Sequence, residues 1–460
     1  MLVAPAGWGQ IQINSSPNLV GSGARALGMG GAFIAVADDA TAASWNPGGL
    51  TQLERPEISA VYSFKWLGEE FAHTTFIAPK TGYEVHLDDF NYLSVAYPFK
   101  RTIAGRNFVL SLNYQHKFDF DRAFQFQARS PLTALGGGLF YHTNYDIRYK
   151  QEGSLSALSP AFGFEITNKL SCGLVANLWD SDLISSNGWE SYTEGRVWGH
   201  LNSGLGGIGR LSTYEEYENF QGTNYTVGLL YKPMERLSLG AVYHAGFKAH
   251  VDYTRRYTSL NYPFPVFNIV FPTYRSRLEI EFPQAYGLGA AYRFADEKLT
   301  LSLDVTRRDW DDFVQTDDQL GGRGRISPIT GLRKDMSPHD PTYSVRLGAE
   351  YVFVDATKPV QNFLPSLRGG LFYDPEPASG RKQFLWWVKD GDGKVDDYYG
   401  VTLGAGVLIK NRVNIDAVYQ YRWGSDVRSE TIRTPNRIIE SGFKTDVDQH
   451  AAYVSTVIYF

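Results

Sequence analysis

The sequence predicts an all-β fold, a transmembrane antiparallel β-barrel of about fourteen strands with an N-terminal hatch, or plug, inside its lumen. Three observations predict this fold. Aromatic residues make up 15% of the chain, segments of alternating apolar and polar residues fill most of it, and short connections alternate with long ones. Alternation with period two places side chains on the two faces of a strand, and unequal connections are typical of bacterial outer-membrane barrels.

Composition excludes several other classes of protein. The chain has 460 residues, a formal net charge of -5 and no basic block, so no nucleic-acid partner is expected. No apolar run approaches the roughly 20 residues of a spanning helix. Cys172 is the only cysteine, which excludes a disulfide framework and a multi-cysteine metal site. Residues 1–7 lack the features of a signal peptide, which we expect to have been removed or to lie before this sequence.

The first element is a compact segment, residues 21–50, that is rich in glycine and alanine and lacks alternation. Its charges are Arg25, Asp38 and Asp39. Small side chains allow close backbone packing, and Gly28, Gly30 and Gly31 permit backbone angles that are closed to other residues. We therefore predict that residues 1–54 form a hatch and residues 55–460 the barrel. The predicted hatch and gate residues are Arg25, Gly28, Gly30, Gly31, Phe33, Asp38, Asp39, Asn46 and Pro47.

Alternating segments follow one another from residue 57 to the end of the chain. Residues 107–118 show the pattern most clearly, with Leu110 and Leu112 on one face and Ser111 and Asn113 on the other. Two long segments contain a proline, Pro160 or Pro283, which we interpret as a break or bulge within one strand. The predicted strands are 57–66, 92–99, 107–118, 145–167, 169–178, 224–231, 235–251, 275–294, 298–310, 343–353, 364–373, 398–409, 412–423 and 451–460.

The connections predict the orientation of the barrel. Long connections at residues 180–222, 251–274, 311–341 and 425–449 are expected to be outer loops, and the short ones periplasmic turns. The last strand ends at Phe460 and is similar to the terminal signature that the barrel assembly machinery reads. We therefore expect a monomer in the bacterial outer membrane, in contact with outer-membrane lipid.

Two groups of candidate binding residues lie in this barrel. Apolar patches often mark binding sites, and the long loops carry the aromatic residues Trp189, Tyr192, Trp198, Tyr262, Phe264, Phe267 and Phe271, which predict a hydrophobic capture groove. The alternative is that these loops pack on each other or insert into lipopolysaccharide. A polar lumenal wall is predicted from Arg275, Arg277, Glu279, Asp304, Arg346, Arg368 and Asp416. An arginine there could hold a carboxylate, but we favour the interpretation that these residues form a salt-bridged wall that anchors the hatch. Arg25, Asp38 and Asp39 are expected to pair with this wall.

Cofactor and enzyme signals are weak. Residues 390–397 alternate acidic oxygen ligands with glycine, as a Ca²⁺ loop does, but they lack the spacing of an EF-hand and are interpreted as a solvated acidic turn. The chain has no Gly-x-Ser-x-Gly elbow, no His-Glu-x-x-His motif and no phosphate loop between a strand and a helix. We predict no cofactor, no metal and no enzymatic activity.

The hatch motifs resemble a known family. The N-terminal segment looks like the hatch of the FadL/TodX outer-membrane transporters in three places: residues 23–33, Ala37-Asp38-Asp39-Ala40 and Asn46-Pro47-Gly48-Gly49-Leu50. It differs at Gly48, where that family has the alanine of its Asn-Pro-Ala element. Residues 281–289 and 310–313 are similar to its later strands.

The resemblance implies a fourteen-stranded barrel with a plug and a route for long-chain fatty acids or hydrocarbons. The ligand would be captured by the loops, bound in the lumen beside the hatch and released sideways without an energy source. The alternative is a plugged barrel that serves as a protein-secretion shuttle or interaction protein. An outer-membrane lipase is a third, weaker option.

Overall fold

The computed structural model describes residues 22–460 with internal gaps. The residues outside the description are 1–21, 74–80, 104, 130–132, 185–186, 202–205, 262–271, 295–297, 320–323, 330–332, 337, 356, 358–360, 378–381, 385–387, 390–393 and 435–436. No helix among the described residues is long and apolar enough to cross a membrane.

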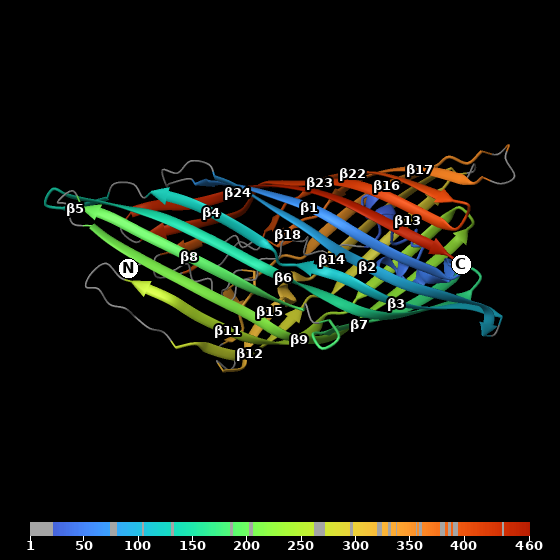
Figure 1. Ribbon diagram of the computed structural model, residues 1–460, viewed down its shortest axis with the longest axis horizontal. Coiled ribbons are helices and arrows are strands. Elements are labelled where there is room, and N and C mark those ends of the chain that lie inside the picture. The colour runs from blue at the N-terminus through green and yellow to red at the C-terminus, as the bar shows by residue number, and fades with distance from the viewer. Residues whose placement is uncertain are drawn as a thin grey trace.

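Fourteen of the described strands form the wall of a closed antiparallel barrel (Figure 1), as the sequence predicts. The barrel closes where the first strand pairs with the last, from Glu57 opposite Tyr459 to His73 opposite Phe443. The wall strands are β1 (Glu57–His73), β2 (Thr81–Ile103), β3 (Arg106–Asp119), β6 (Leu139–Thr167), β7 (Leu170–Asp180), β9 (Gly206–Met234), β10 (Leu237–His244), β13 (Ala285–Arg293), β14 (Leu299–Arg308), β16 (Thr342–Val352), β17 (Phe363–Tyr373), β22 (Tyr399–Ile409), β23 (Val413–Thr434) and β24 (Arg437–Tyr459).

The wall is apolar outside and polar inside. On β3, Leu110 and Leu112 are exposed, whereas Ser111 and Asn113 are buried. The terminal strand alternates in the same way, because Val454 and Ile458 are exposed whereas Ser455 and Val457 are buried. Lipid-facing and lumen-facing residues alternate in this way along transmembrane strands.

Beyond the wall, at the end opposite the short turns, further strands lengthen the sheet. β6 and β9 each contain 29 residues and pair there with strands that the wall does not contain. The prediction of loops at residues 180–222, 251–274 and 425–449 is therefore wrong for much of their length, since ladder pairs continue through all three segments. These outer strands are β4 (Arg122–Arg129), β5 (Thr133–Gly136), β8 (Gly188–Leu201), β11 (Phe247–Asn261), β12 (Tyr274–Phe282) and β15 (Val314–Asp317).

Short elements complete the described chain. Two short helices and a 3₁₀ turn, drawn in blue inside the short-turn end of the barrel in Figure 1, occupy residues 24–52. They are α1 (Ala24–Gly28), α2 (Ala42–Trp45) and η1 (Pro47–Gln52). The remaining elements are η2 (Trp310–Asp312), η4 (Lys334–Met336), β18 (Glu376–Pro377), β19 (Lys382–Phe384), β20 (Val388–Lys389) and β21 (Val395–Asp396).

The wall is interrupted at one level on three adjacent strands. Residues 245–246 separate β10 from β11, Pro283 and Gln284 separate β12 from β13, and residues 309–313 separate β14 from β15. Proline lacks the N–H that a ladder requires, so Pro283 ends the pairing there. The sequence correctly placed a break at Pro283, but Pro160 continues within β6.

Candidate functional site

Residues 22–53 pass through the lumen and contact strands all around it. Tyr92 of β2 and Ser302 of β14 donate hydrogen bonds to their carbonyl groups, and Thr402 of β22 both donates to Gly28 and accepts from Gly30. Most of these residues are buried, and Phe33 is completely so. The segment therefore lies across the lumen and is held by opposite parts of the wall.

Glycines of the wall make this contact possible. A Cβ atom at Gly370 would overlap the backbone nitrogen of Gly30, and one at Gly348 would overlap the carbonyl oxygen of Met29. Gly228 lies in the same way against Asn46. Inward-facing glycines on β9, β16 and β17 thus allow the segment to pack backbone against backbone.

Ion pairs join the segment to the wall. The Arg25 guanidinium binds both carboxylate oxygens of Glu350 at 2.8 Å and also contacts Asp38 and Asp39. Asp38 in turn lies 3.8 Å from Arg293 on β13. Burial raises the pKa of the Asp39 carboxyl above its usual value, although the Arg25 guanidinium opposes that rise.

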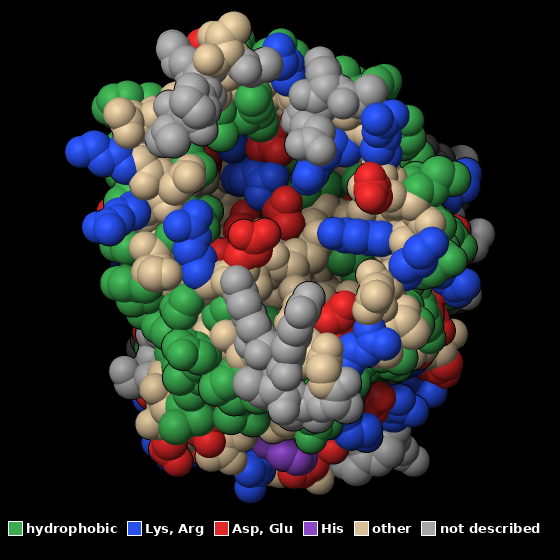
Figure 2. Space-filling model, turned by 90° about the vertical axis from the view of Figure 1, so that its right-hand side faces the viewer, with side chains coloured by type: hydrophobic (Ala, Val, Ile, Leu, Met, Phe, Trp, Pro, Cys, Tyr) green, Lys and Arg blue, Asp and Glu red, His purple; other side chains and the backbone are tan. Residues whose placement is uncertain are grey.

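Four of the predicted wall residues lie against this segment or its ion pairs. Asp304 accepts the backbone N–H of Ile34 at 2.8 Å, and Arg346 donates to the carbonyl of Gly30 at 3.1 Å. Arg368 bridges Glu350 and Asp416, with both contacts at 2.7 Å. Figure 2 shows the short-turn end of the barrel, where acidic and basic side chains surround a central hollow.

Asn46 fixes the segment to one strand. Its side-chain nitrogen donates to the carbonyls of Ile34 and Leu229 at 2.8 and 2.9 Å, and its oxygen accepts the N–H of Gly48 at 3.0 Å. Pro47 begins the 3₁₀ turn that follows. Because one side chain satisfies three backbone groups in a buried place, Asn46 both shapes the segment and ties it to β9.

The remaining three predicted wall residues do not face the lumen. Arg275 and Arg277 are exposed, and Glu279 pairs with Lys248 of β11 on the outward side of the sheet. The alternate positions of β12, Leu278 and Ile280, are the buried ones. The prediction is wrong here because β12 turns its apolar face inward, towards an interior aromatic cluster.

The predicted loop groove is also not assembled as expected. Trp189 is buried and stacks on Tyr217, whereas Tyr192, three positions along β8, is exposed on the opposite face. Trp198 lies further out on the same strand and is partly exposed. Residues that face opposite sides of a strand cannot line one groove. Tyr262, Phe264, Phe267 and Phe271 lie outside the described residues, as does the 390–393 half of the acidic turn.

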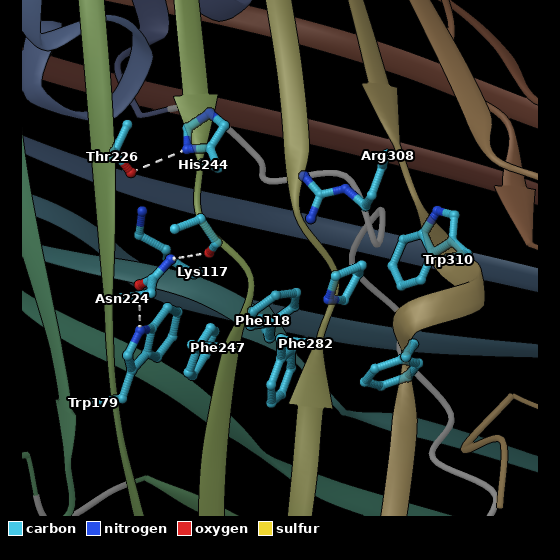
Figure 3. Close-up of a pocket in the computed structure, with 13 residues that line it drawn as sticks. Lys117, Phe118, Trp179, Asn224, Thr226, His244, Phe247, Phe282, Arg308 and Trp310 are labelled. Carbon is cyan, nitrogen blue, oxygen red and sulfur yellow. Dashed lines mark hydrogen bonds between the residues drawn. The ribbon is translucent and has the colours of Figure 1, made fainter.

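A small pocket lies in the interior where the wall is interrupted (Figure 3). Its apolar side consists of stacked rings, with Trp179 and Phe247 5.5 Å apart and Phe247 and Phe282 4.8 Å apart. Phe118, Trp310 and Phe313 extend this surface. Thr226 of β9 also lines the pocket, and Gly228, two residues further along the same inward face, contacts Asn46. The pocket therefore lies next to residues 22–53.

The other side of the pocket is basic. Lys117 and Arg308 are 6% and 4% exposed, and Figure 3 shows His244 and Arg308 above the aromatic rings. The pocket lining contains no carboxylate, and no described acidic side chain lies within 4.0 Å of either cation. The Nε atom of Arg308 has no hydrogen-bond partner among the described residues. His244 and Asn224 are already paired, with Thr226 and Trp179 respectively.

Sequence reasoning missed this pocket. Trp310 and Phe313, which the sequence alone did not connect with a binding site, are 2% and 1% exposed and face the interior. The available signal was the sequence His116-Lys117-Phe118, where two polar residues interrupt the alternation of β3. An extra residue at this point forms a β-bulge, which turns both Lys117 and Phe118 inwards.

Comparison with known proteins gives the same architecture. Similar solved structures include a Pseudomonas aeruginosa FadL homologue, matched at a TM-score of 0.54 and 14% identity over 99% of this chain and 98% of the other. The Pseudomonas putida toluene transporter TodX matches at a TM-score of 0.51 and 14% identity, over 98% of this chain and all of the other. No curated protein matches the sequence.

A family model settles the relationship. The model described as outer membrane protein transport protein (OMPP1/FadL/TodX) matches residues 141–459, which is more than half of the chain. The match and the closed fourteen-stranded wall place the protein in the bacterial outer membrane. The chain belongs to the OMPP1/FadL/TodX family of outer membrane transport proteins.

Proposed function

We propose that the protein takes up hydrophobic small molecules with an anionic head group, of which long-chain fatty acids are the best match. The family consists of transport channels rather than enzymes. Residues 22–53 serve as the hatch in this proposal. The binding site is the pocket next to them that is lined by Lys117, Arg308 and the stacked aromatic rings. The observation that carries the proposal is the pairing of buried cations with stacked aromatic rings in one pocket.

The cations favour an acid over a neutral hydrocarbon. A ligand without a head group would leave the Lys117 and Arg308 charges buried with no described carboxylate within 4.0 Å, which is energetically costly. A carboxylate would accept charge-assisted hydrogen bonds from both side chains. The apolar tail would lie along the rings of Trp179, Phe247 and Phe282, gaining about 25 cal/mol for each Å² of apolar surface buried.

The interruption of the wall offers an exit. Ala245 and Pro283, which line the pocket, belong to the segments where pairing stops on adjacent strands. A ligand bound there lies next to a part of the wall where ladder pairing is interrupted on three adjacent strands. We therefore propose that the ligand leaves sideways at this level, between the outer strands β11 and β12 and the wall strands β10 and β13.

Equilibrium binding to the purified protein tests the head-group preference. The unmodified protein should bind oleate at least tenfold more tightly than oleyl alcohol, and the double variant Lys117→Met, Arg308→Met should lose that preference. Each charge-assisted hydrogen bond contributes about 1.5–3 kcal/mol, and 1.4 kcal/mol corresponds to about tenfold in affinity.

The control is Arg307→Met, because Arg307 is adjacent in sequence but 49% exposed and paired with Asp309. This variant should keep the preference for oleate. Equal binding of the acid and the alcohol by the unmodified protein would contradict the proposal, and so would an unchanged preference in the double variant.

A further inference from the structure

A second gap in the wall lies between β2 and β3. Their pairing runs from Ile103 to Tyr92 of β2 and ends with Tyr92 opposite Gln115. From Phe90 outwards, the described ladder pairs of β2 are with β1 alone. Beyond Gln115, the described pairs of β3 are with β6. Ladder pairing between the two strands thus stops at Tyr92 and Gln115 and does not extend to their outer ends.

Three metal-ligating side chains meet at this gap. Asp89 comes from β2, and His116 and Asp119 come from β3. One ligand atom from each lies within 4.8 Å of the others. Two β-bulges produce this arrangement, one at residue 91 opposite β1 and one at residue 117 opposite β6. Bulges re-aim side chains and are frequent at functional sites.

The environment of His116 points to a ligand. His116 is only 7% exposed, and its Nε2 atom has no hydrogen-bond partner among the described residues. That atom lies 3.5 Å from Oδ2 of Asp89. Two ligand atoms on a tetrahedral Zn²⁺ ion, each about 2.0–2.1 Å from the metal, lie roughly 3.4 Å apart. The imidazole and the nearest carboxylate therefore already have the separation of two zinc ligands.

We propose that Asp89, His116 and Asp119 bind a divalent transition metal ion, with Zn²⁺ as the best match, that links β2 to β3 across the gap. The imidazole nitrogen favours zinc over Ca²⁺ and Mg²⁺, which take oxygen ligands. Three protein ligands leave the fourth position of a tetrahedral ion to water. The Asp89 side chain is 35% exposed and provides the path by which the ion enters.

One described charge opposes the ion. The Lys65 ammonium lies 3.3 Å from Oδ2 of Asp119, whose Oδ1 accepts the N–H of Asp121. A carboxylate has about four lone-pair sites, so Asp119 can keep these partners and still reach a metal. The two carboxylates and one ammonium leave a net negative charge, which favours a cation.

Titration of the metal-stripped, detergent-solubilised protein with ZnCl₂ tests this site. One ion per chain should bind, and Zn²⁺ should raise the apparent melting temperature, because a ligand that binds only the folded state stabilises it. Millimolar Ca²⁺ should not displace it. His116→Asn and Asp89→Asn should each weaken Zn²⁺ binding at least tenfold.

The matched control is His86→Asn. His86 lies on the same strand as Asp89 and 3.9 Å from Glu84, but its side chain is 65% exposed, and its loss should leave Zn²⁺ binding unchanged. Asp89→Asn is nearly isosteric and decides the question if the His116 variant does not fold. Absence of zinc binding to the unmodified protein would overturn the proposal, as would equal affinity in the Asp89 variant.

Discussion

Single glycines decide how closely residues 22–53 approach the wall. On β17, Gly370 faces inwards against the backbone of Gly30, whereas Gly369 faces the other way. A side chain at Gly370 would meet backbone atoms, which cannot rotate away as the end of a flexible side chain can. The tight packing of the proposed hatch therefore depends on a residue that the sequence marks only as a glycine within a strand.

This contrast predicts different effects for two neighbouring substitutions. Gly370→Ala should lower the free energy of unfolding by about 1–3 kcal/mol, because overpacking forces the backbone to shift. Gly369→Ala should change it by less than about 0.5 kcal/mol, since the nearest atom to the new Cβ is Thr402 O at 3.8 Å. Denaturant titration of both refolded proteins measures the difference. Similar effects would show that contact with Gly30 does not limit position 370.

At the scale of elements, the sequence predicted the wall better than its outer extension. Alternation along β14 or β23 is set by lipid on one side and lumen on the other, so a single segment carries the signal. The extension depends on pairs between distant segments, such as Trp189 opposite Tyr217, which no single segment reveals. The sequence placed Arg275 on the lumenal face for the same reason, because β12 belongs to the outer extension and its apolar face turns inwards.

The proposed role of the strand break at Pro283 as an exit for the ligand can be tested with a single substitution. Pro283→Val restores a backbone N–H and should allow β12 and β13 to join into one continuous strand, with ladder pairs to the neighbouring strands across the break. The proposed exit would then be narrower. Oleate uptake by cells that express this variant should fall several-fold, and it should fall by a larger factor than the equilibrium affinity of the purified protein for oleate. Pro160→Val is the control, because Pro160 lies within a continuous strand and away from the pocket. Unchanged uptake in the Pro283 variant would place the exit elsewhere.

At the scale of the whole molecule, wall and lumen are built from separate parts of the chain. Closure of the barrel uses pairs between β1 and β24, which lie entirely within residues 57–459. The salt bridges of Arg368 with Glu350 and Asp416 join wall strands to one another and do not need the N-terminal segment. Arg25, in the N-terminal segment inside the lumen, joins this network through its salt bridge with Glu350. The Gly-rich composition of residues 21–50 suggested a separate part, and the charged residues suggested salt bridges between that part and the wall. The sequence did not reveal the wall glycines, such as Gly370, that the segment packs against.

This separation predicts the effect of deleting residues 22–53 and the chain before them. The remaining barrel should insert and close, because its ladder is intact, and water should replace the segment around Glu350 and Asp304. Reconstituted in planar bilayers, it should conduct ions continuously, whereas the unmodified protein stays mostly closed. Heat-modifiable migration on gels verifies that the deleted form is folded. If it is folded but does not conduct, another part of the chain blocks the lumen; if it cannot fold, residues 22–53 act as a core and not as a gate.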